Sequence, residues 1–306
     1  MGNIVDAELR DTFDRIRDLW RHGLAVIESA YCRVDGNSRT VLPGERQQPA
    51  LVVPLDYDGV VPAAKSREPY RALTKLFEAS LARMTGTCSQ LLPLAELCEA
   101  PDEAVDDVSP YWNNGFFTGM DARIAYAFAR LRAPGRIVEI GSGNSTRFFR
   151  KAILDGDLPT QLIAIDPSPR LSAAKVADEV IPKSVLEIPV DFFAALAPGD
   201  ILFFDGSHLC FHGSDVPHFF LRILPEVPRG VLVHIHDVPL PDEYPEHFDT
   251  RYYSEQYVLA AFLLHNTEWR VTVPVHFLFQ KGVLSGDGGS FWIERTGGAE
   301  TSAPSP

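Results

Sequence analysis

An alternation of short apolar segments with helical patterns, from about residue 111 onward, is the feature that most constrains the fold. The predicted strands cover residues 136–140, 161–166, 200–205 and 230–237. The predicted helices cover residues 120–132, 145–154, 169–178 and 215–224. Nearly continuous apolar strands joined by helices are typical of a parallel sheet that is buried on both faces. We therefore predict an α/β fold with a doubly wound, mostly parallel sheet and helices on both faces.

The rest of the chain is predicted to have a different organisation. Two later strands are expected at 269–279 and 290–295, and the tail 297–306 is expected to be disordered. Before the α/β part, we expect an amphipathic helix at 5–30, a short strand at 50–53, a helical stretch at 67–99 broken near Gly86 and Pro93, and an acidic linker at 101–107. The predicted domains are a mainly helical or irregular accessory region, 1–110, and an α/β domain, 111–296.

Composition narrows the classes of partner. The chain has 41 acidic and 28 basic residues, a formal net charge of −13, and no cluster of Lys and Arg along the sequence. Such a chain repels a phosphate backbone, so nucleic acid and anionic membranes are not expected as partners. The four cysteines form no metal-binding spacing, and no apolar run is long enough for a membrane helix. We predict a cytoplasmic protein and leave its oligomeric state open.

Four acidic residues stand at or near the ends of the predicted parallel strands: Glu139, Asp166, Asp205 and Asp237. A single Asp in such a place is often only the N-cap of the next helix. In open parallel sheets, however, ligands bind in the crevice at the carboxyl ends of the strands. Four acidic residues at one such edge favour a ligand crevice.

The first of these strands runs into a glycine turn, Gly141-Ser142-Gly143, followed by Asn144-Ser145-Thr146. Glycines at this turn are expected to let the backbone pass close beneath a nucleoside. A dinucleotide-binding turn has a third small residue where this chain has Thr146, and Glu139 is unfavourable beside a pyrophosphate. These departures argue against a nicotinamide cofactor.

The segment instead resembles the first motif of Rossmann-like S-adenosylmethionine-dependent methyltransferases. The resemblance implies that the cofactor is S-adenosylmethionine, with Glu139 facing its positively charged methionine end and Asp166 accepting from the ribose hydroxyls. The stretch 110–117 resembles a segment that closes over the cofactor in one bacterial branch of these enzymes. The predicted cofactor-binding residues are Glu139, Gly141, Ser142, Gly143, Ser145, Asp166 and Asn114.

A second motif, Asp205-Gly206-Ser207-His208, resembles one in metal-dependent sugar and macrolide O-methyltransferases. The resemblance implies that Asp205 binds a divalent ion and that His208 takes the proton from the acceptor hydroxyl. Two further ligands are expected after the next strand, where this chain has His236 and Asp237. Because His236 replaces a carboxylate, the identity of the metal stays open: Mg²⁺ prefers oxygen, whereas imidazole suits Fe, Mn, Ni or Zn.

Two histidines of this region and the loop after Asp237 have expected roles as well. His234 and His236 share one face of their strand, and His234, the deeper of the two, is expected to be a hydrogen-bonded core residue. His208 is placed in a loop, where freedom to move suits acid–base work. The loop after Asp237, rich in proline and aromatic residues, is long enough to act as a substrate lid.

The function predicted from the sequence is S-adenosylmethionine-dependent O-methylation of a small molecule or glycoside, assisted by a metal and by His208 as general base. One alternative is a metal-dependent oxidase or lyase that uses Asp205, His236 and Asp237 on the same fold. Others are a nicotinamide-dependent oxidoreductase and a non-catalytic binding protein. The acidic residues and His208 argue against a mere binder, which needs no base.

Overall fold

A computed structural model describes residues 67–169, 175–248 and 251–297 of the chain. Residues from Ser66 onward form one compact unit. The predicted helix at 5–30, the strand at 50–53 and the tail after residue 297 lie outside the described residues, as does part of the helix predicted at 169–178.

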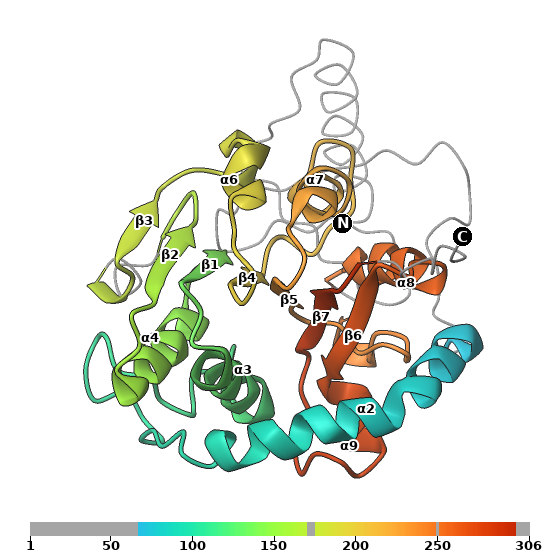
Figure 1. The fold of residues 1–306 in the computed structure, drawn as a ribbon, viewed down its shortest axis with the longest axis horizontal. Coiled ribbons are helices and arrows are strands. Elements are labelled where there is room, and N and C mark those ends of the chain that lie inside the picture. Colours follow the sequence, from blue (N-terminus) through green and yellow to red (C-terminus); the bar gives the residue numbers. More distant parts are fainter. Residues whose placement is uncertain (1–66, 170–174, 249–250, 298–306) are drawn as a thin grey trace, which may run out of the picture. The chain divides into compact units, whose positions relative to one another are not determined.

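The sheet of this unit has seven strands in the order β3-β2-β1-β4-β5-β7-β6 (Figure 1). Their bounds are β1 Arg136–Ile140, β2 Gln161–Ile165, β3 Glu179–Ile181, β4 Ile201–Phe204, β5 Leu232–Ile235, β6 Trp269–Pro274 and β7 Phe291–Arg295. The first five strands pair in parallel, and β7 runs antiparallel to both β5 and β6. This is the predicted doubly wound, mostly parallel sheet.

The register brings the carboxyl ends of the central strands to one level. Ile140 of β1 pairs with Ile165 of β2 and with Phe204 of β4, and Phe204 pairs in turn with Ile235 of β5. The residues that follow these four positions therefore lie side by side along one edge of the sheet. This edge is where the sequence places its candidate site.

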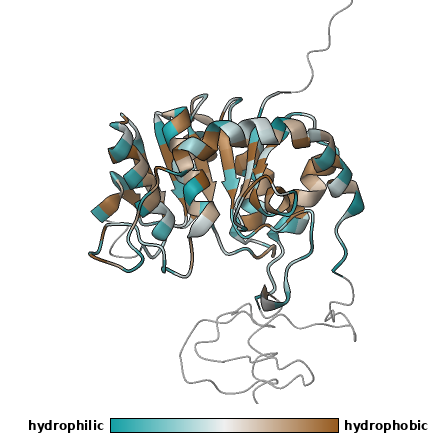
Figure 2. Cartoon of the chain, turned by 90° about the horizontal axis from the view of Figure 1, so that it is seen from below, coloured by the Kyte–Doolittle hydropathy of each residue, from teal (hydrophilic) through white to brown (hydrophobic). Residues whose placement is uncertain are grey.

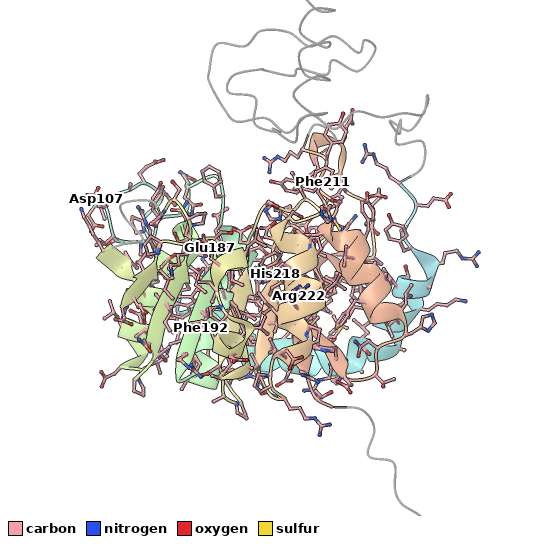
Figure 3. The ribbon with its side chains drawn as sticks, turned by 90° about the horizontal axis from the view of Figure 1, so that it is seen from above. Asp107, Glu187, Phe192, Phe211, His218 and Arg222 are labelled. Atoms are coloured by element: carbon pink, nitrogen blue, oxygen red, sulfur yellow. The ribbon has the colours of Figure 1, made fainter. Side chains whose placement is uncertain are left out.

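Helices cover both faces of the sheet (Figure 1). The longer ones are α2 Arg71–Ala95, α3 Gly119–Arg132, α4 Asn144–Gly156 and α8 Glu255–Leu264; the shorter ones are α6 Val190–Ala194, α7 Asp215–His218 and α9 Val275–Gln280. The strands are largely hydrophobic, and hydrophilic residues gather on the outer sides of helices and in loops (Figure 2). A core of aliphatic and aromatic side chains fills the space between the layers (Figure 3).

Helix α2 is unbroken, against the prediction of breaks at Gly86 and Pro93. Its buried residues Phe77, Met84 and Leu91 lie on one face, and packing of α2 on α3 and β6 outweighs the weak helix preference of one glycine. Pro93 lies in the last turn, where the loss of one backbone hydrogen bond costs little. The predicted boundary at residue 110 stays a prediction, and α2 packs within the unit that contains the sheet.

Three other predicted elements differ in extent. The strand expected at 269–279 ends at Pro274, and the chain continues as α9, because proline ends the pairing with β7. The helix expected at 215–224 is divided into α7, a π-helical turn at Phe219–Ile223 and a 3₁₀ turn. The edge strand β3 was not predicted, since three residues leave no readable pattern. Within the described residues, no helix has both the length and the apolarity needed to cross a membrane.

Candidate active site

The turn after β1 lies directly against the end of β4. Gly141 has a φ of 86°, and a Cβ placed on it would come within 2.1 Å of the backbone oxygen of Asp205. Its amide donates to the carbonyl of Ile165, and the amide of Asp205 donates to that of Ile140, both at 2.9 Å. The expected reason for Gly141, room for a nucleoside, is therefore not the one the structure shows: any side chain here would collide with the next strand end.

The start of α4, the helix that follows this turn, is capped by one of its own residues. The Oγ1 of Thr146 accepts from the amide of Gly143 at 3.1 Å, and both Ser145 and Thr146 are buried in the first turn of α4. Thr146, which departs from the dinucleotide pattern, thus stabilises the helix start. The predicted contacts of Ser145 and Gly143 with the cofactor stay predictions.

Beneath the turn, Glu139 is fully buried, and both of its carboxyl oxygens lack a hydrogen-bond partner in the part of the chain that the structure describes. Burial raises the pKa of Glu139 to about 8. A buried carboxyl group without a partner is costly, and a cationic or hydrogen-bonding ligand would relieve that cost. The orphaned oxygens therefore fit the predicted role of Glu139 toward a positively charged cofactor.

Asp166, immediately after β2, binds the same turn from the other side. One carboxylate oxygen accepts from the amide and the hydroxyl of Ser142, at 2.9 and 2.8 Å, and the other accepts from the amide of Ser168 at 2.8 Å. This places the predicted ribose-binding carboxylate next to the glycine turn. A carboxylate oxygen can accept more than one hydrogen bond, so Asp166 keeps capacity for a ligand.

Asn114 makes its described hydrogen bonds within its own loop. Its amide nitrogen donates to the carbonyls of Tyr111 and Phe117, and its oxygen accepts from the amides of Phe116 and Phe117. These four contacts use the full hydrogen-bonding capacity of the side chain and close the loop before α3. The predicted contact of Asn114 with the cofactor stays a prediction.

The loop after β4 carries Asp205 and His208 and is held at its base by Asp215, the first residue of α7. The carboxylate of Asp215 accepts from the amide of Ser207 at 2.7 Å and also contacts the hydroxyl of Ser207. A Cβ on Gly206 would come within 2.4 Å of Asp215 and 2.9 Å of the ring of Phe204. Only glycine fits there, which explains the residue between Asp205 and Ser207.

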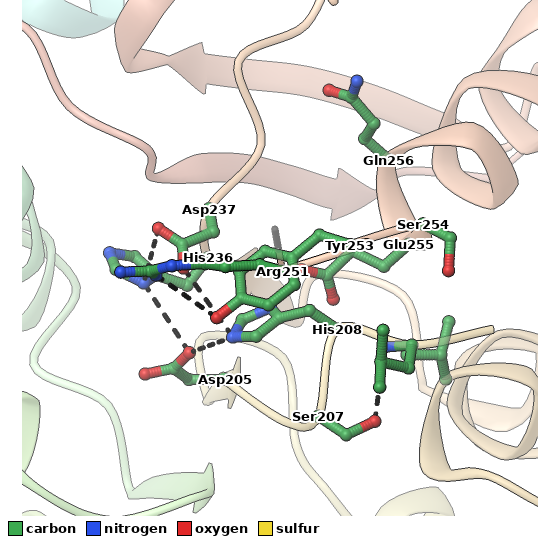
Figure 4. Close-up of polar contacts among 12 residues, drawn as sticks. Asp205, Ser207, His208, His236, Asp237, Arg251, Tyr253, Ser254, Glu255 and Gln256 are labelled. Atoms are coloured by element: carbon green, nitrogen blue, oxygen red, sulfur yellow. Dashed lines mark hydrogen bonds and ion pairs between the residues drawn. The ribbon is translucent and has the colours of Figure 1, made fainter. Parts of the chain in front are cut away.

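His208 is buried rather than free in its loop, which corrects the expectation of a residue free to move. Its Nδ1 contacts Glu255, and its Nε2 lies 3.2 Å from Oδ1 of Asp205 and 3.7 Å from Oδ2 of Asp237 (Figure 4). Its ring stacks on Tyr253 with centroids 4.3 Å apart. Every polar atom of the imidazole therefore faces a carboxylate.

His236 occupies a similar acidic setting beside it. Its Nδ1 lies 3.6 Å from both Asp205 and Asp237, and its Nε2 lies 3.5 Å from Asp121 at the start of α3. Asp121 in turn accepts from the amides of Gly289 and Ser290, so it ties α3 to the loop before β7. The structure thus brings together the four residues predicted for catalysis and metal binding.

The electrostatics of this group follow from its excess of carboxylates. Burial lowers the pKa of His208 and of His236, but the neighbouring carboxylates more than offset this, and both pKa values lie well above the usual range. Burial alone would raise the pKa of Asp205, but the two histidines hold it well below its usual range. The carboxylates outnumber the imidazoles, so the group remains negative even when both imidazoles are protonated.

His234 precedes His236 by two residues on β5 and is a core residue, as expected. It is fully buried, its Nε2 lies 2.9 Å from the hydroxyl of Ser290, and its ring stacks on Phe203 with centroids 3.8 Å apart. Burial lowers its pKa well below the usual range. It is therefore a neutral imidazole that supports the sheet.

The predicted metal donors do not fit a shared ion in this arrangement. They contact one another instead: Nδ1 of His236 lies 3.6 Å from an oxygen of Asp205 and 3.6 Å from an oxygen of Asp237. Across the described ranges, no three His, Cys, Asp or Glu side chains are arranged to hold a metal ion.

Sequence reasoning missed three residues that shape the site: Asp121, Asp215 and Glu255. Each stands in the first turn of a helix, where an acidic residue also stabilises the helix dipole. Because stabilisation of the helix already explains an acidic residue at this position, the sequence gives no sign of a second role. The residue that each one contacts lies on another element, which the sequence does not reveal.

Comparison with known proteins agrees with this geometry. Residues 138–238, which run from β1 past β5, match the family described as "Methyltransferase domain". A search of curated proteins finds no match. The matched segment contains the glycine turn, Asp166, Asp205, His208 and Asp237.

Solved structures that resemble the chain are distant in sequence. An O-methyltransferase from Bacillus cereus in complex with S-adenosylhomocysteine (SAH) is 13% identical, with 74% of this chain and 97% of that chain covered and a TM-score of 0.37. An SAH-bound methyltransferase from Podospora anserina is 15% identical, with coverages of 81% and 99% and a TM-score of 0.39. MycE from the mycinamycin biosynthetic pathway, in complex with Mg, SAH and mycinamycin VI, is 15% identical, with coverages of 87% and 70% and a TM-score of 0.40. At TM-scores below 0.5, these likenesses carry no argument about the site.

The doubly wound sheet, the glycine turn after its first strand and the family match together define a Rossmann-like, class I methyltransferase domain. The match to the methyltransferase domain covers residues 138–238, about a third of the chain.

Proposed function

We propose that this enzyme methylates a hydroxyl group of a small molecule or glycoside, with His208 as the general base. The observation that carries the proposal is the contact between the cofactor turn and the reaction loop. Gly141 abuts the backbone of Asp205, whose carboxylate lies 3.2 Å from Nε2 of His208. A methyl donor bound at the turn would then lie close in space to the base that takes the proton of the acceptor.

When bound, S-adenosylmethionine supplies a sulfonium methyl group: as the acceptor oxygen bonds to the methyl carbon, the carbon–sulfur bond breaks and its electron pair stays on sulfur. The hydroxyl proton must leave the acceptor, and we assign it to His208 in its neutral form, which must first lose the proton that the raised pKa of His208 favours. Because Nδ1 faces Glu255, the nitrogen that accepts is Nε2. The imidazolium that forms is stabilised by Glu255 and Asp205, which raise the pKa of His208.

The acidic surroundings also suit a cationic methyl donor. Among the described residues, no Lys or Arg forms an ion pair with Asp121, Asp205, Asp237 or Glu255. Negative charge that is not cancelled by fixed cations favours the binding of a positively charged ligand. On the cofactor side, a cationic ligand would stabilise the charged form of Glu139, whose raised pKa keeps the free carboxyl group protonated at neutral pH.

We propose an acceptor with an apolar face. Phe211, in the loop that carries His208, and Tyr252, next to Tyr253 in the sequence, are exposed aromatic residues. Aromatic rings bind the apolar faces of sugars and aromatic compounds. We propose no step through a metal, since the donors do not fit a shared ion.

The decisive test is the His208→Ala variant, assayed with S-adenosylmethionine labelled in the methyl group and a panel of phenols and glycosides. Turnover should fall roughly a hundred- to ten-thousand-fold, the usual contribution of a general base. Calorimetric affinity for S-adenosylhomocysteine should change little. Equal turnover in the variant and the wild type would refute the role of His208, and methyl transfer only to amines or thiols would refute O-methylation.

A further inference from the structure

A buried carboxylate stands behind His208, on the side away from Asp205. Glu255, the first residue of α8, has no exposed surface, and its Oε1 contacts Nδ1 of His208 (Figure 4). The two residues are 47 positions apart in the sequence. Neither the family match nor the motif that contains His208 includes Glu255.

The start of α8 also holds the backbone of the His208 loop. The carbonyl of His208 accepts from the amide of Ser254 at 2.8 Å, and the hydroxyl of Ser254 accepts from the amide of Cys210 at 2.8 Å. His208 has a φ of 61°, a left-handed conformation that a residue with a side chain keeps only when its surroundings enforce it. Asp237 and Tyr252 are left-handed as well, so the site concentrates such backbone.

The direction of the imidazole follows from this arrangement. With Nδ1 on Glu255 and one face of the ring on Tyr253, Nε2 can point only toward Asp205 and Asp237. Carboxylates face both ring nitrogens, but the contact of Glu255 with Nδ1 is the closer one, so the neutral ring keeps its proton on Nδ1 and Nε2 is the acceptor. Orientation and tautomer are the two properties that a histidine base needs.

We propose that Glu255 is a positioning residue for His208: it orients the imidazole, selects the Nδ1–H tautomer and stabilises the imidazolium formed when Nε2 takes the acceptor proton. This inference rests on the proposed function. Glu255 touches neither acceptor nor cofactor in this role and acts only through His208.

A purely structural role is the competing explanation, because the same contact also joins α8 to the loop. The two explanations differ in what glutamine does at position 255. Glutamine keeps the size and an acceptor oxygen, so it preserves the joint, but it removes the charge that stabilises the imidazolium. Aspartate keeps the charge and withdraws it by one methylene group.

The experiment compares Glu255→Gln and Glu255→Asp with a matched control, Glu243→Gln. Glu243 is a nearby carboxylate that accepts from Tyr257 at 2.7 Å and from Gln256 at 3.1 Å and has no contact with His208. Three quantities are measured: kcat and KM with the acceptor panel, calorimetric affinity for S-adenosylhomocysteine, and the Nδ1 proton resonance of His208 in protein labelled with ¹⁵N-histidine.

Glu255→Gln should lower kcat roughly ten- to a hundred-fold with KM and S-adenosylhomocysteine affinity nearly unchanged, as expected when a charge-assisted hydrogen bond becomes a neutral one. The Nδ1 proton resonance should move upfield. Glu255→Asp should recover part of kcat, and Glu243→Gln should retain both kcat and the resonance.

An unchanged resonance in Glu255→Gln, or a fall in kcat matched by loss of the folded state, would overturn the positioning role. Failure of the proposed function is distinguishable, because it appears as a wild-type protein that methylates no hydroxyl acceptor. In that case the resonance still reports whether Glu255 sets the tautomer of His208.

Discussion

The candidate site has two halves, a cofactor side and a reaction side, and they differ in whether their carboxyl groups have charged partners. On the cofactor side, Glu139 is buried without a hydrogen-bond partner in the described residues, and Asp166 binds only neutral donors. On the reaction side, Asp205 lies between two imidazoles, and His208 lies between two carboxylates. In the first half both oxygens of Glu139 lack a hydrogen-bond partner, whereas the second half pairs most of its polar atoms with one another and leaves only Nε2 of His236 and Oε2 of Glu255 without a hydrogen bond among the described residues.

This difference indicates which contacts fix the geometry of each half. The cofactor side needs only a turn that backbone contacts fix in place. The reaction side needs one imidazole in one orientation. Glu255 of α8 contacts this imidazole, Asp215 of α7 holds the loop that carries it, and Asp121 of α3 faces the neighbouring His236. Changes on the two sides should therefore have different consequences.

Gly141→Ala should have the largest effect and should damage both halves together. Its Cβ would overlap the backbone oxygen of Asp205 at 2.1 Å, at a φ of 86°. We expect a loss of roughly 2–4 kcal/mol in the free energy of unfolding, from overpacking and a left-handed backbone, together with loss of S-adenosylhomocysteine binding. Chemical denaturation and calorimetry measure the two quantities.

The control is Gly86→Ala in α2, where a Cβ meets nothing within 4 Å. This change should stabilise the protein by about 1 kcal/mol through helix propensity. If Gly141→Ala is equally harmless, the turn does not touch Asp205 in solution, and the link between the two halves is wrong.

Glu139→Gln should change how stability depends on pH. The folded pKa of Glu139, about 8, lies above the ordinary value of 4.5, so the folded state keeps a proton that the unfolded state loses. Its contribution to the free energy of unfolding therefore falls as the pH rises from 4.5 to 8, by at most about 1.4 kcal/mol per pH unit.

Replacing the acid with an amide removes that dependence. The melting temperature of Glu139→Gln, relative to wild type, should rise between pH 5 and 8, whereas Glu99→Gln, at an exposed residue, should follow the wild type. Parallel melting curves for Glu139→Gln and wild type across this range would show that Glu139 has a partner in solution.

Asp166→Ala should weaken the binding of S-adenosylhomocysteine by roughly one to two decades, the value of hydrogen bonds to a charged group. Glu179→Ala is the control, because it removes an exposed carboxylate from the neighbouring strand β3. Calorimetry should show no loss for Glu179→Ala. An unchanged affinity in folded Asp166→Ala would mean that its carboxylate does not bind the cofactor.

The sequence was sufficient to predict most of the fold and the location of the site. The apolar strands are short and regular, and each acidic residue directly follows or closes one, so parallel pairing alone brings Asp166, Asp205 and Asp237 to one edge. The contacts of His208 could not be predicted. Glu255 reaches it from a helix 47 residues later, and the crossing of helix and loop depends on packing that no local pattern encodes.

The same limit applies to individual residues. The sequence predicts that Gly141 lies beneath the cofactor, and the structure adds its close approach to Asp205 at the end of another strand. Asn114 is also predicted to contact the cofactor, and its four hydrogen bonds in the structure all go to residues 111–117 of its own loop. In both cases the residue type was informative, and its partner was not visible in the sequence.

Metal removal should have the smallest effect. It tests directly whether the reaction side, unlike the cofactor side, works without a bound ligand of its own. The sequence predicts an ion at Asp205, His236 and Asp237, whereas the structure pairs these side chains with one another. Turnover after exhaustive chelation should therefore stay within about two-fold of the untreated enzyme, since each imidazole already has carboxylate partners. Elemental analysis of the same sample provides the control, because it shows whether chelation removed anything. Loss of activity that returns with Mn²⁺ or Mg²⁺, together with near-stoichiometric metal in the untreated protein, would mean that the reaction side is also incomplete without a ligand.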